Sequence, residues 1–317
     1  AKLCKKEKYE LVHHITYVTC ILPTFMHKLD VPFLYGPVSG GENTPAIIGY
    51  PMSRKQYIVE RIRTLSQLFF SMTPNYHRTM KNAALILTTT EETKAIVPAK
   101  YRDKVRLFQS IGLTEDIFFP EPATKNNTVP QFLAAGRMLY WKGFEMTIRS
   151  FVEALKNGTK AELTILGDTE NNKDYIVHRE HLRKMCGEYL DREIHFVNRV
   201  PYSEMKNFYD KFDVLLNCSL RDSGCFVVME AMSRGLPVIC VDAGGPKVNT
   251  TSDSAIKIEP APMDMMIQKV KEAIEVLAND STKRVEMGRK ARAHAMKNFL
   301  ISERTKQMNC YYEEVRK

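Results

Sequence analysis

A single carboxylate inside an apolar run is the first feature of the sequence that points to chemistry. The stretch LRDSGCFVVMEAM, residues 220–232, places Glu230 among side chains that are typical of a buried helix. Burying an unpartnered carboxylate costs on the order of several kcal/mol. Glu230 can offset that cost by accepting two hydroxyl hydrogen bonds, as from a ribose diol, each worth roughly 1.5–3 kcal/mol. The spacing equally allows an ion pair with Arg234, which lies one helical turn later.

The residues before Glu230 indicate an anion-binding helix terminus. Asp222 or Ser223 can cap a helix that begins near 224–225. The first N–H groups of a helix carry the positive end of its dipole, which stabilises an anion by about 0.3–2 kcal/mol. Because helical side chains lean toward the N-terminus, Glu230 would lie near such an anion. The N–H groups concerned belong to Cys225, Phe226 and Val227.

A second stretch, AAGRMLYWKGF at 134–144, predicts another anion-binding loop. Gly136 and Arg137 follow an apolar strand, and Lys142 precedes a helix that opens at Gly143. Two cations beside helix N–H groups are the arrangement that a phosphate needs. The alternative is that both basic side chains are simply exposed on a loop.

A regular alternation of strands and helices positions these residues. Apolar strands are expected at 131–135, 161–167, 193–198, 212–219, 236–242 and 255–260, with helices at 143–156, 173–189 and 203–210. This alternation predicts βαβ units in a parallel doubly wound sheet, where ligands bind beyond the carboxyl ends of the strands. The polar positions that follow strands are Arg137, Asp168, Asp222 to Gly224, Gly244 and Gly245.

The first part of the chain shows the same alternation more thinly. Strands are expected within YELVHHITYV, PFLYGPVSGGE, AALILTTTEET and KVRLFQSIGL, which amounts to half of a Rossmann-like domain. We expect an N-terminal domain over 1–122 and a C-terminal domain over 123–298, joined by the polar, proline-bearing segment 120–129. A helix over 299–317 is expected to pack back on the first domain.

The net charge of +9 is concentrated in one segment. Residues 54–82 contain six basic side chains and one acidic side chain, with Ile58, Ile62, Leu65, Leu68 and Phe69 at helical spacing. Such a basic amphipathic helix suits an anionic membrane surface, and a core helix with a solvated basic face is an equal alternative. No nucleic-acid-binding motif is present, and no apolar run reaches the roughly 18 residues of a membrane span. The seven scattered cysteines include no CxxC pair, which favours a reducing compartment and no zinc site.

Three linked motifs carry a resemblance to a known family. FLAAGRMLYWKGFEMTIRSF, AELTILGD and SLRDSGCFVVMEAMSRGLPVICVDAGGP together resemble the donor half of a GT-B glycosyltransferase of family 4, the glycosyl transferases group 1. LVHHITYV and PFLYGPVSGGE resemble the acceptor half of a branch with DSG and GPVGGGE-like patterns. The resemblance implies an α/β fold with two Rossmann-like domains facing a cleft. It also implies that roughly 100 residues of the N-terminal domain, including a glycine-rich loop, are missing.

The resemblance also assigns roles to individual residues. Arg137 and Lys142 match the pair that binds the donor pyrophosphate, and Glu230 matches the second glutamate of the E-x7-E motif, which holds the ribose. Asp222 takes the place of the first glutamate, facing the transferred sugar, although its side chain is one methylene shorter. One of the adjacent histidines His13 and His14 matches the acceptor-side histidine, and we expect it to be His14. The remaining donor-binding positions are Gly136, Gly224, Cys225, Phe226, Val227, Gly244 and Gly245; the family's usual glycine at 225 has moved to 224.

The function implied by the resemblance is a retaining glycosyltransferase that needs no metal. Its donor would be a UDP- or GDP-linked sugar. Its acceptor would be a glycan or a lipid-linked precursor of a surface polysaccharide, reached from the cytoplasm at the inner face of the membrane. The alternative is a nucleotide-sugar-binding protein with little or no turnover, because the missing loop normally contacts the donor phosphate and the acceptor.

Overall fold

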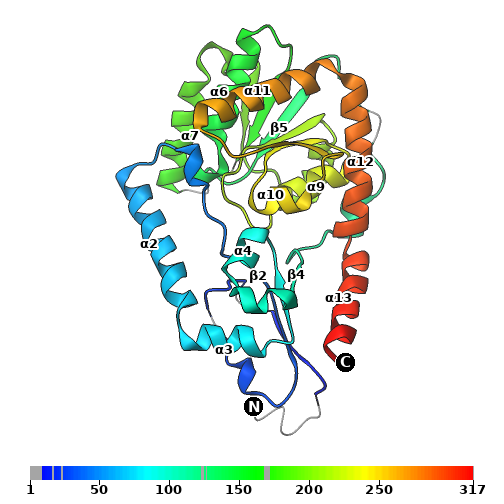
Figure 1. The fold of residues 1–317 in the computed structure, drawn as a ribbon. Coiled ribbons are helices and arrows are strands. Elements are labelled where there is room, and N and C mark those ends of the chain that lie inside the picture. The colour runs from blue at the N-terminus through cyan, green and yellow to red at the C-terminus, as the bar shows by residue number, and fades with distance from the viewer. Residues whose placement is uncertain are drawn as a thin grey trace. The chain divides into compact units, whose positions relative to one another are not determined.

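The chain folds into two compact units (Figure 1). The computed structural model describes residues 9–15, 18–22, 24–122, 125, 127–167 and 172–316, so Asp168 lies outside the described residues. Unit 1 consists of Ala1–Asn43, Pro51–Gly112 and Ser302–Lys317, and unit 2 consists of Thr44–Tyr50 and Leu113–Ile301. The division falls earlier in the chain than the expected boundary at 122, and a short segment from the N-terminal part belongs to unit 2.

Unit 2 is built on a six-stranded sheet in which every paired strand is parallel. The strand order is β10-β9-β8-β5-β6-β7. The strands are β5 Gln131–Ala135, β6 Glu162–Leu166, β7 Ile194–Val197, β8 Val214–Asn217, β9 Val238–Val241 and β10 Ala255–Ile258. The doubly wound parallel sheet predicted for this part of the chain is confirmed, and each strand lies within its expected range.

Helices cover both faces of this sheet. One pair of neighbouring helices is α6 and α11, and another is α9 and α12 (Figure 1). The α6 stripe buries Phe151, whose ring lies 5.5 Å from that of Phe132 on β5. The helical elements of unit 2 are η2 Ala46–Ile48, α5 Glu115–Phe118, η4 Tyr140–Lys142, α6 Phe144–Lys156, α7 Lys173–Met185, η5 Gly187–Tyr189, α8 Tyr202–Tyr209, α9 Phe226–Ser233, α10 Gly244–Asn249, α11 Met263–Asn279 and α12 Ser281–Phe299.

One helix of unit 2 is shorter than expected. The sequence predicts a helix over 173–189, whereas α7 ends at Met185 and a separate 3-10 turn follows. Gly187 has a φ of 57°, a left-handed conformation that interrupts an α-helix.

Unit 1 has a parallel sheet in the order β1-β2-β3-β4. The strands are β1 Val12–His14, β2 Phe33–Val38, β3 Leu85–Thr88 and β4 Val105–Leu107, and the helical elements are η1 Met26–Lys28, α2 Arg54–Ser71, α3 Pro74–Asn82, α4 Glu91–Ile96, η3 Ala99–Lys104 and α13 Ile301–Arg316. One cluster joins Tyr76 and Met80 of α3 to strand residues such as Phe33. A second cluster joins Val315 of α13 to Leu34. The C-terminal helix therefore belongs to the core of unit 1.

The basic segment forms two helices instead of the single one expected. Ser53 and Gln56 form a capping box at the start of α2. Thr73 caps α3, whose first residue is Pro74, and a proline cannot continue a preceding helix. Gln67 is buried in α2, while Ile62 and Phe69 are 61% and 66% exposed. Within the described residues, α2 is therefore no core helix, and no helix is both long and apolar enough to cross a bilayer.

Candidate functional site

The candidate site lies at the carboxyl edge of the unit 2 sheet. β9, β8 and β5 are neighbours in that sheet, so the loops that follow them meet at one edge. The N–H of Leu220 donates to the carbonyl of Trp141 at 2.8 Å, which joins the β8 loop to the β5 loop. The N–H of Gly245 donates to the carbonyl of Asp222 at 2.7 Å, which joins the β9 loop to the β8 loop.

Two glycines allow this close approach of backbones. Gly143 has a φ of 71°, and a Cβ there would overlap the carbonyl of Cys218. Gly244 has a φ of 57°, and a Cβ there would overlap the carbonyl of Asp222. The structure thus places Gly244 and Gly245 against the backbone of the β8 loop, and their part in donor binding stays a prediction.

Lys142 and Asp222 form an ion pair in this structure. The Nζ atom of Lys142 donates to Oδ2 of Asp222, and both side chains are mostly buried, at 17% and 15% exposed. The second carboxylate oxygen of Asp222 accepts a hydrogen bond from the N–H of Cys225 at 3.1 Å. Arg137 is exposed, and within the described part of the chain its guanidinium has no hydrogen-bonding partner. Two of the residues predicted to bind the phosphate and the sugar, Lys142 and Asp222, therefore neutralise each other's charge in this structure.

The helix after this loop begins later than predicted. We expected it to begin near 224–225 with a cap from Asp222 or Ser223, but α9 begins at Phe226. Cys225 has a φ of 48° and is therefore left-handed, so Asp222 caps the N–H of Cys225 and no N–H of the helix. Among the described residues, nothing accepts a hydrogen bond from the N–H groups of Phe226 and Val227. These two N–H groups are therefore available to an anion, and their binding of one stays a prediction.

Glu230 is buried in α9, and among the described residues its carboxylate accepts one hydrogen bond. The hydroxyl of Tyr209 donates to Oε2 of Glu230 at 2.7 Å. Burial raises the pKa of the Glu230 carboxyl, and the hydrogen bond from Tyr209 opposes that rise. Arg234 does not pair with Glu230, because its guanidinium makes two 2.8 Å bonds to the carboxylate of Asp210. The ion-pair alternative for Glu230 is therefore wrong.

Tyr209 is the site residue that the sequence patterns did not predict. It is the last residue of α8, and its side chain is 1% exposed. No sequence pattern marks Tyr209, because its contact with Glu230 joins two helices whose packing is not recorded in local spacing.

The two adjacent histidines of β1 point to opposite faces of the unit 1 sheet. His13 contacts the carbonyl of Gly36 at 2.6 Å and the hydroxyl of Tyr312 at 2.9 Å. The Nδ1 atom of His14 is buried without a partner among the described residues, and its ring lies 5.4 Å from that of Tyr35. Burial lowers the pKa of the His14 imidazole, which favours its neutral form. His13 is thus a packed strand histidine, and the role of His14 stays a prediction.

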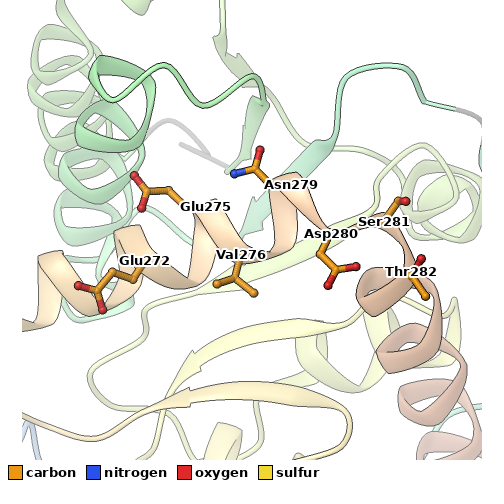
Figure 2. Close-up of a pocket in the computed structure, with 7 residues that line it drawn as sticks. All are labelled: Glu272, Glu275, Val276, Asn279, Asp280, Ser281 and Thr282. Carbon is orange, nitrogen blue, oxygen red and sulfur yellow. The ribbon is translucent and has the colours of Figure 1, made fainter.

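A hollow elsewhere in unit 2 is a weaker candidate. It lies between the end of α11 and the start of α12, and its lining includes Glu272, Glu275 and Asp280 (Figure 2). Because α11 follows β10 back across the sheet, its last turn lies at the amino edge, opposite the ligand-binding edge. Each carboxylate already has a partner: Gln268 donates to Glu272, Lys271 pairs with Glu275, and Asp280 caps α12. The described residues contain no group of three or more potential metal ligands.

Comparison with known proteins connects this geometry to a family. The family model described as Glycosyl transferases group 1 matches residues 116–294. A phosphatidylinositol N-acetylglucosaminyltransferase component from Arabidopsis thaliana is 23% identical over 161 residues, which are 51% of this chain and 34% of that protein. A GDP-mannose-dependent phosphatidylinositol monomannoside mannosyltransferase from Corynebacterium glutamicum is 23% identical over 64% of this chain and 49% of its own length. This chain therefore spans less than half the length of these two curated relatives.

Solved structures show the same fold. A glycosyltransferase from Rickettsia africae matches 100% of this chain and 79% of its own, with a TM-score of 0.68 and 16% identity. Anabaena HepE, solved with UDP-glucose, matches 89% of this chain and 72% of its own, with a TM-score of 0.60 and 14% identity. These likenesses confirm the predicted α/β fold class of the GT-B type.

Proposed function

Because this chain belongs to the glycosyl transferases group 1 family, we propose that it transfers a sugar from a nucleotide-sugar donor to a glycan or lipid-linked acceptor. One observation carries this proposal. Lys142 pairs with Asp222, and Asp222 accepts a hydrogen bond from Cys225, the residue before the helix α9 that carries Glu230. Both loops, after β5 and after β8, follow strands of a single parallel sheet. The carboxyl edge of such a sheet is where nucleotides bind.

Each group has a part in the proposed donor complex. Arg137 and Lys142 bind the pyrophosphate and stabilise its charge as the nucleoside diphosphate departs. The N–H groups of Phe226 and Val227 contribute the positive end of the α9 dipole. Glu230 holds the ribose, and Asp222 orients the transferred sugar after Lys142 has turned to the phosphate.

The proposed reaction keeps the configuration of the transferred sugar. The acceptor hydroxyl attacks the anomeric carbon from the side of the leaving group, and its proton passes to the departing phosphate. No metal takes part, because Arg137, Lys142 and the α9 N–H groups supply the positive charge. His14 of unit 1, whose pKa is lowered by burial, is the proposed acceptor-side histidine and acts in its neutral form.

The proposed donors are UDP- and GDP-linked sugars, and the proposed product belongs to a surface polysaccharide or its lipid-linked precursor. The Corynebacterium relative is named as GDP-mannose-dependent and for a phosphatidylinositol monomannoside. The Arabidopsis relative is likewise named for phosphatidylinositol. These names support an acceptor that carries a lipid.

We further propose that α2 holds the chain on the inner, cytoplasmic face of an anionic membrane. Along this 18-residue helix, Ile58, Ile62, Leu65, Leu68 and Phe69 are each more than half exposed. Exposed apolar side chains that gather on one helix mark an interaction site. Arg54, Lys55 and Arg61 on the same helix, with Arg78 and Lys81 on α3, supply the attraction to anionic lipid.

A thermal-shift screen followed by a turnover assay tests the proposed activity. The full chain is mixed with UDP-, GDP-, ADP- and dTDP-sugars. A ligand at about 100 times its dissociation constant stabilises the fold by roughly 2.7 kcal/mol. The sugar donor that raises the melting temperature is then followed for hydrolysis or transfer, and the anomeric configuration of the product is read by NMR. A melting curve that no nucleotide moves would overturn the proposal, and binding without any turnover would favour the nucleotide-sugar-binding alternative.

A further inference from the structure

Two neighbouring residues at the end of α8 hold two residues of α9 that are one turn apart. Tyr209 donates to Glu230 at 2.7 Å, and Asp210 accepts two 2.8 Å bonds from Arg234. The guanidinium of Arg234 is itself 1% exposed and also donates to the carbonyls of Ile117 and Pro120. The contact between α8 and α9 thus fixes the part of α9 that carries Glu230.

The hydroxyl of Tyr209 acts as a permanent donor. Burial, followed by the nearby carboxylate of Glu230, raises the pKa of Tyr209 well above its usual value, so the hydroxyl keeps its proton. A donor placed on Oε2 selects one orientation of the carboxylate. The remaining acceptor positions of Glu230 are then presented in a fixed direction.

We propose that Tyr209 is a positioning residue that turns the Glu230 carboxylate toward the two hydroxyls of the donor ribose. The inference rests on the proposed function, because it deepens the role of Glu230 in holding the nucleotide. Tyr209 itself does not touch the ligand. It acts through Glu230, as an outer partner orients the ligand-binding group of a site.

The charge state of Glu230 depends on the same contact. Burial raises the pKa of Glu230 and the Tyr209 hydrogen bond opposes that rise, so losing the bond raises the pKa further. Glu230 must be ionised to accept both hydroxyls, so nucleotide binding should be lost as the pH falls and Glu230 becomes protonated. Once Tyr209 is changed, this loss should begin at a higher pH than in wild type. Among the described residues, the charged and titratable groups around this contact include Tyr202 of α8, Cys225 before α9, Asp116 of α5, Arg234 with its partner Asp210, Lys125, and Arg292 of α12, which binds backbone carbonyls.

The test compares UDP with 2′,3′-dideoxy-UDP by calorimetry across a range of pH. Wild type should prefer UDP. Tyr209→Phe keeps the ring and removes the hydroxyl, so it should weaken UDP binding roughly 10-fold. The affinity of this variant for dideoxy-UDP should stay within about 2-fold of the wild-type value. As the pH is lowered, the variant should lose UDP binding at a higher pH than wild type does. Tyr189→Phe, in the 3-10 turn η5 after α7 of the same unit, is the matched control and should behave as wild type.

A second variant separates positioning from packing. Glu230→Gln should abolish the preference for UDP, and adding Tyr209→Phe to it should change that preference no further. The inference is overturned if Tyr209→Phe keeps the wild-type preference for UDP and the wild-type pH dependence of binding. It is also overturned if the variant binds both nucleotides equally more weakly, since that result indicates a structural role. If wild type binds both nucleotides equally well, the proposed function of Glu230 fails instead, so the two failures are distinguishable.

Discussion

At the scale of single residues, the ion pair between Lys142 and Asp222 is the contact that a donor would break under the proposed function. Each of these side chains has the other as its partner. A diphosphate would compete with Asp222 for Lys142, and the released carboxylate of Asp222 could then accept a hydrogen bond from a sugar hydroxyl. Under the proposed function, the pair would therefore couple recognition of the sugar to the arrival of the phosphate.

This coupling predicts opposite effects of one substitution. Asp222→Asn removes the carboxylate that competes for Lys142, so it should strengthen binding of UDP alone by roughly 5-fold. The same variant should lose transfer, because an amide holds the sugar less well than a carboxylate. Calorimetry and a turnover assay measure the two effects. Asp191→Asn, which removes an ion pair to Arg183 in the same unit, is the control and should change neither. Weaker binding of UDP to Asp222→Asn would contradict the coupling.

The sequence indicates which residues bear charge at the site but not which of them pair. Glu230 is recognisable because a carboxylate in an apolar run needs a partner, and spacing alone suggested Arg234. The actual partner, Tyr209, lies 21 positions earlier in the chain. Its contact depends on how α8 packs on α9, and no local pattern records that packing. The left-handed turn at Cys225 was equally hidden, since only glycine, asparagine and aspartate commonly signal such a conformation.

At the scale of elements, the strands were predictable because each is a short apolar run between polar turns. Helix limits were predictable only where a local signal exists. The break between α2 and α3 follows from Pro74, and the single helix that we expected there neglected it. The start of α9 depends on how the β8 loop packs against the β9 loop, and no residue type in either loop predicts that packing.

The packing of these two loops predicts a stability effect. Gly244→Ala places a Cβ against the carbonyl of Asp222 at a φ of 57°, so it should lower the free energy of unfolding by about 1–3 kcal/mol and weaken nucleotide binding. Gly158→Ala is the matched control, because its φ is 84° but no atom lies within 4 Å of the added Cβ. The control should lose about 1 kcal/mol or less and bind nucleotide normally. Equal effects of the two variants in urea unfolding and calorimetry would contradict the close packing.

The exposed face of α2 predicts lipid binding. Wild type should sediment with phosphatidylglycerol vesicles more than with phosphatidylcholine vesicles, and less so as salt is raised. The paired change Ile62→Glu and Phe69→Glu should reduce this binding 10-fold or more, since burying each side chain is worth roughly 1.5–3 kcal/mol.

The control for α2 is Val285→Glu. Val285 is an exposed valine of α12 in unit 2, at 73% exposed, and its replacement should leave lipid binding unchanged. Vesicle binding that survives the change on α2, or a wild-type chain that does not bind anionic vesicles, would contradict the proposed membrane contact of α2.

At the scale of the whole molecule, the division into units was only partly predictable. A polar, proline-bearing segment suggested a boundary, but residues 44–50 join unit 2 through contacts distant in sequence. Ile48 is 1% exposed there, and the ring of Tyr50 lies 6.3 Å from that of Tyr140. Such crossings of the chain arise from packing between remote segments, which composition does not reveal.

The most direct measurement for the central claim is calorimetry of the full chain with the nucleotide that the thermal-shift screen selects. Lys142→Ala and Glu230→Ala should each weaken binding at least about 10-fold, because each removes a charge-assisted contact worth roughly 1.5–3 kcal/mol. Lys160→Ala, an exposed lysine of the same unit, should bind as wild type does. If both site variants retain wild-type affinity, the carboxyl edge of the unit 2 sheet does not hold the nucleotide and the account is contradicted.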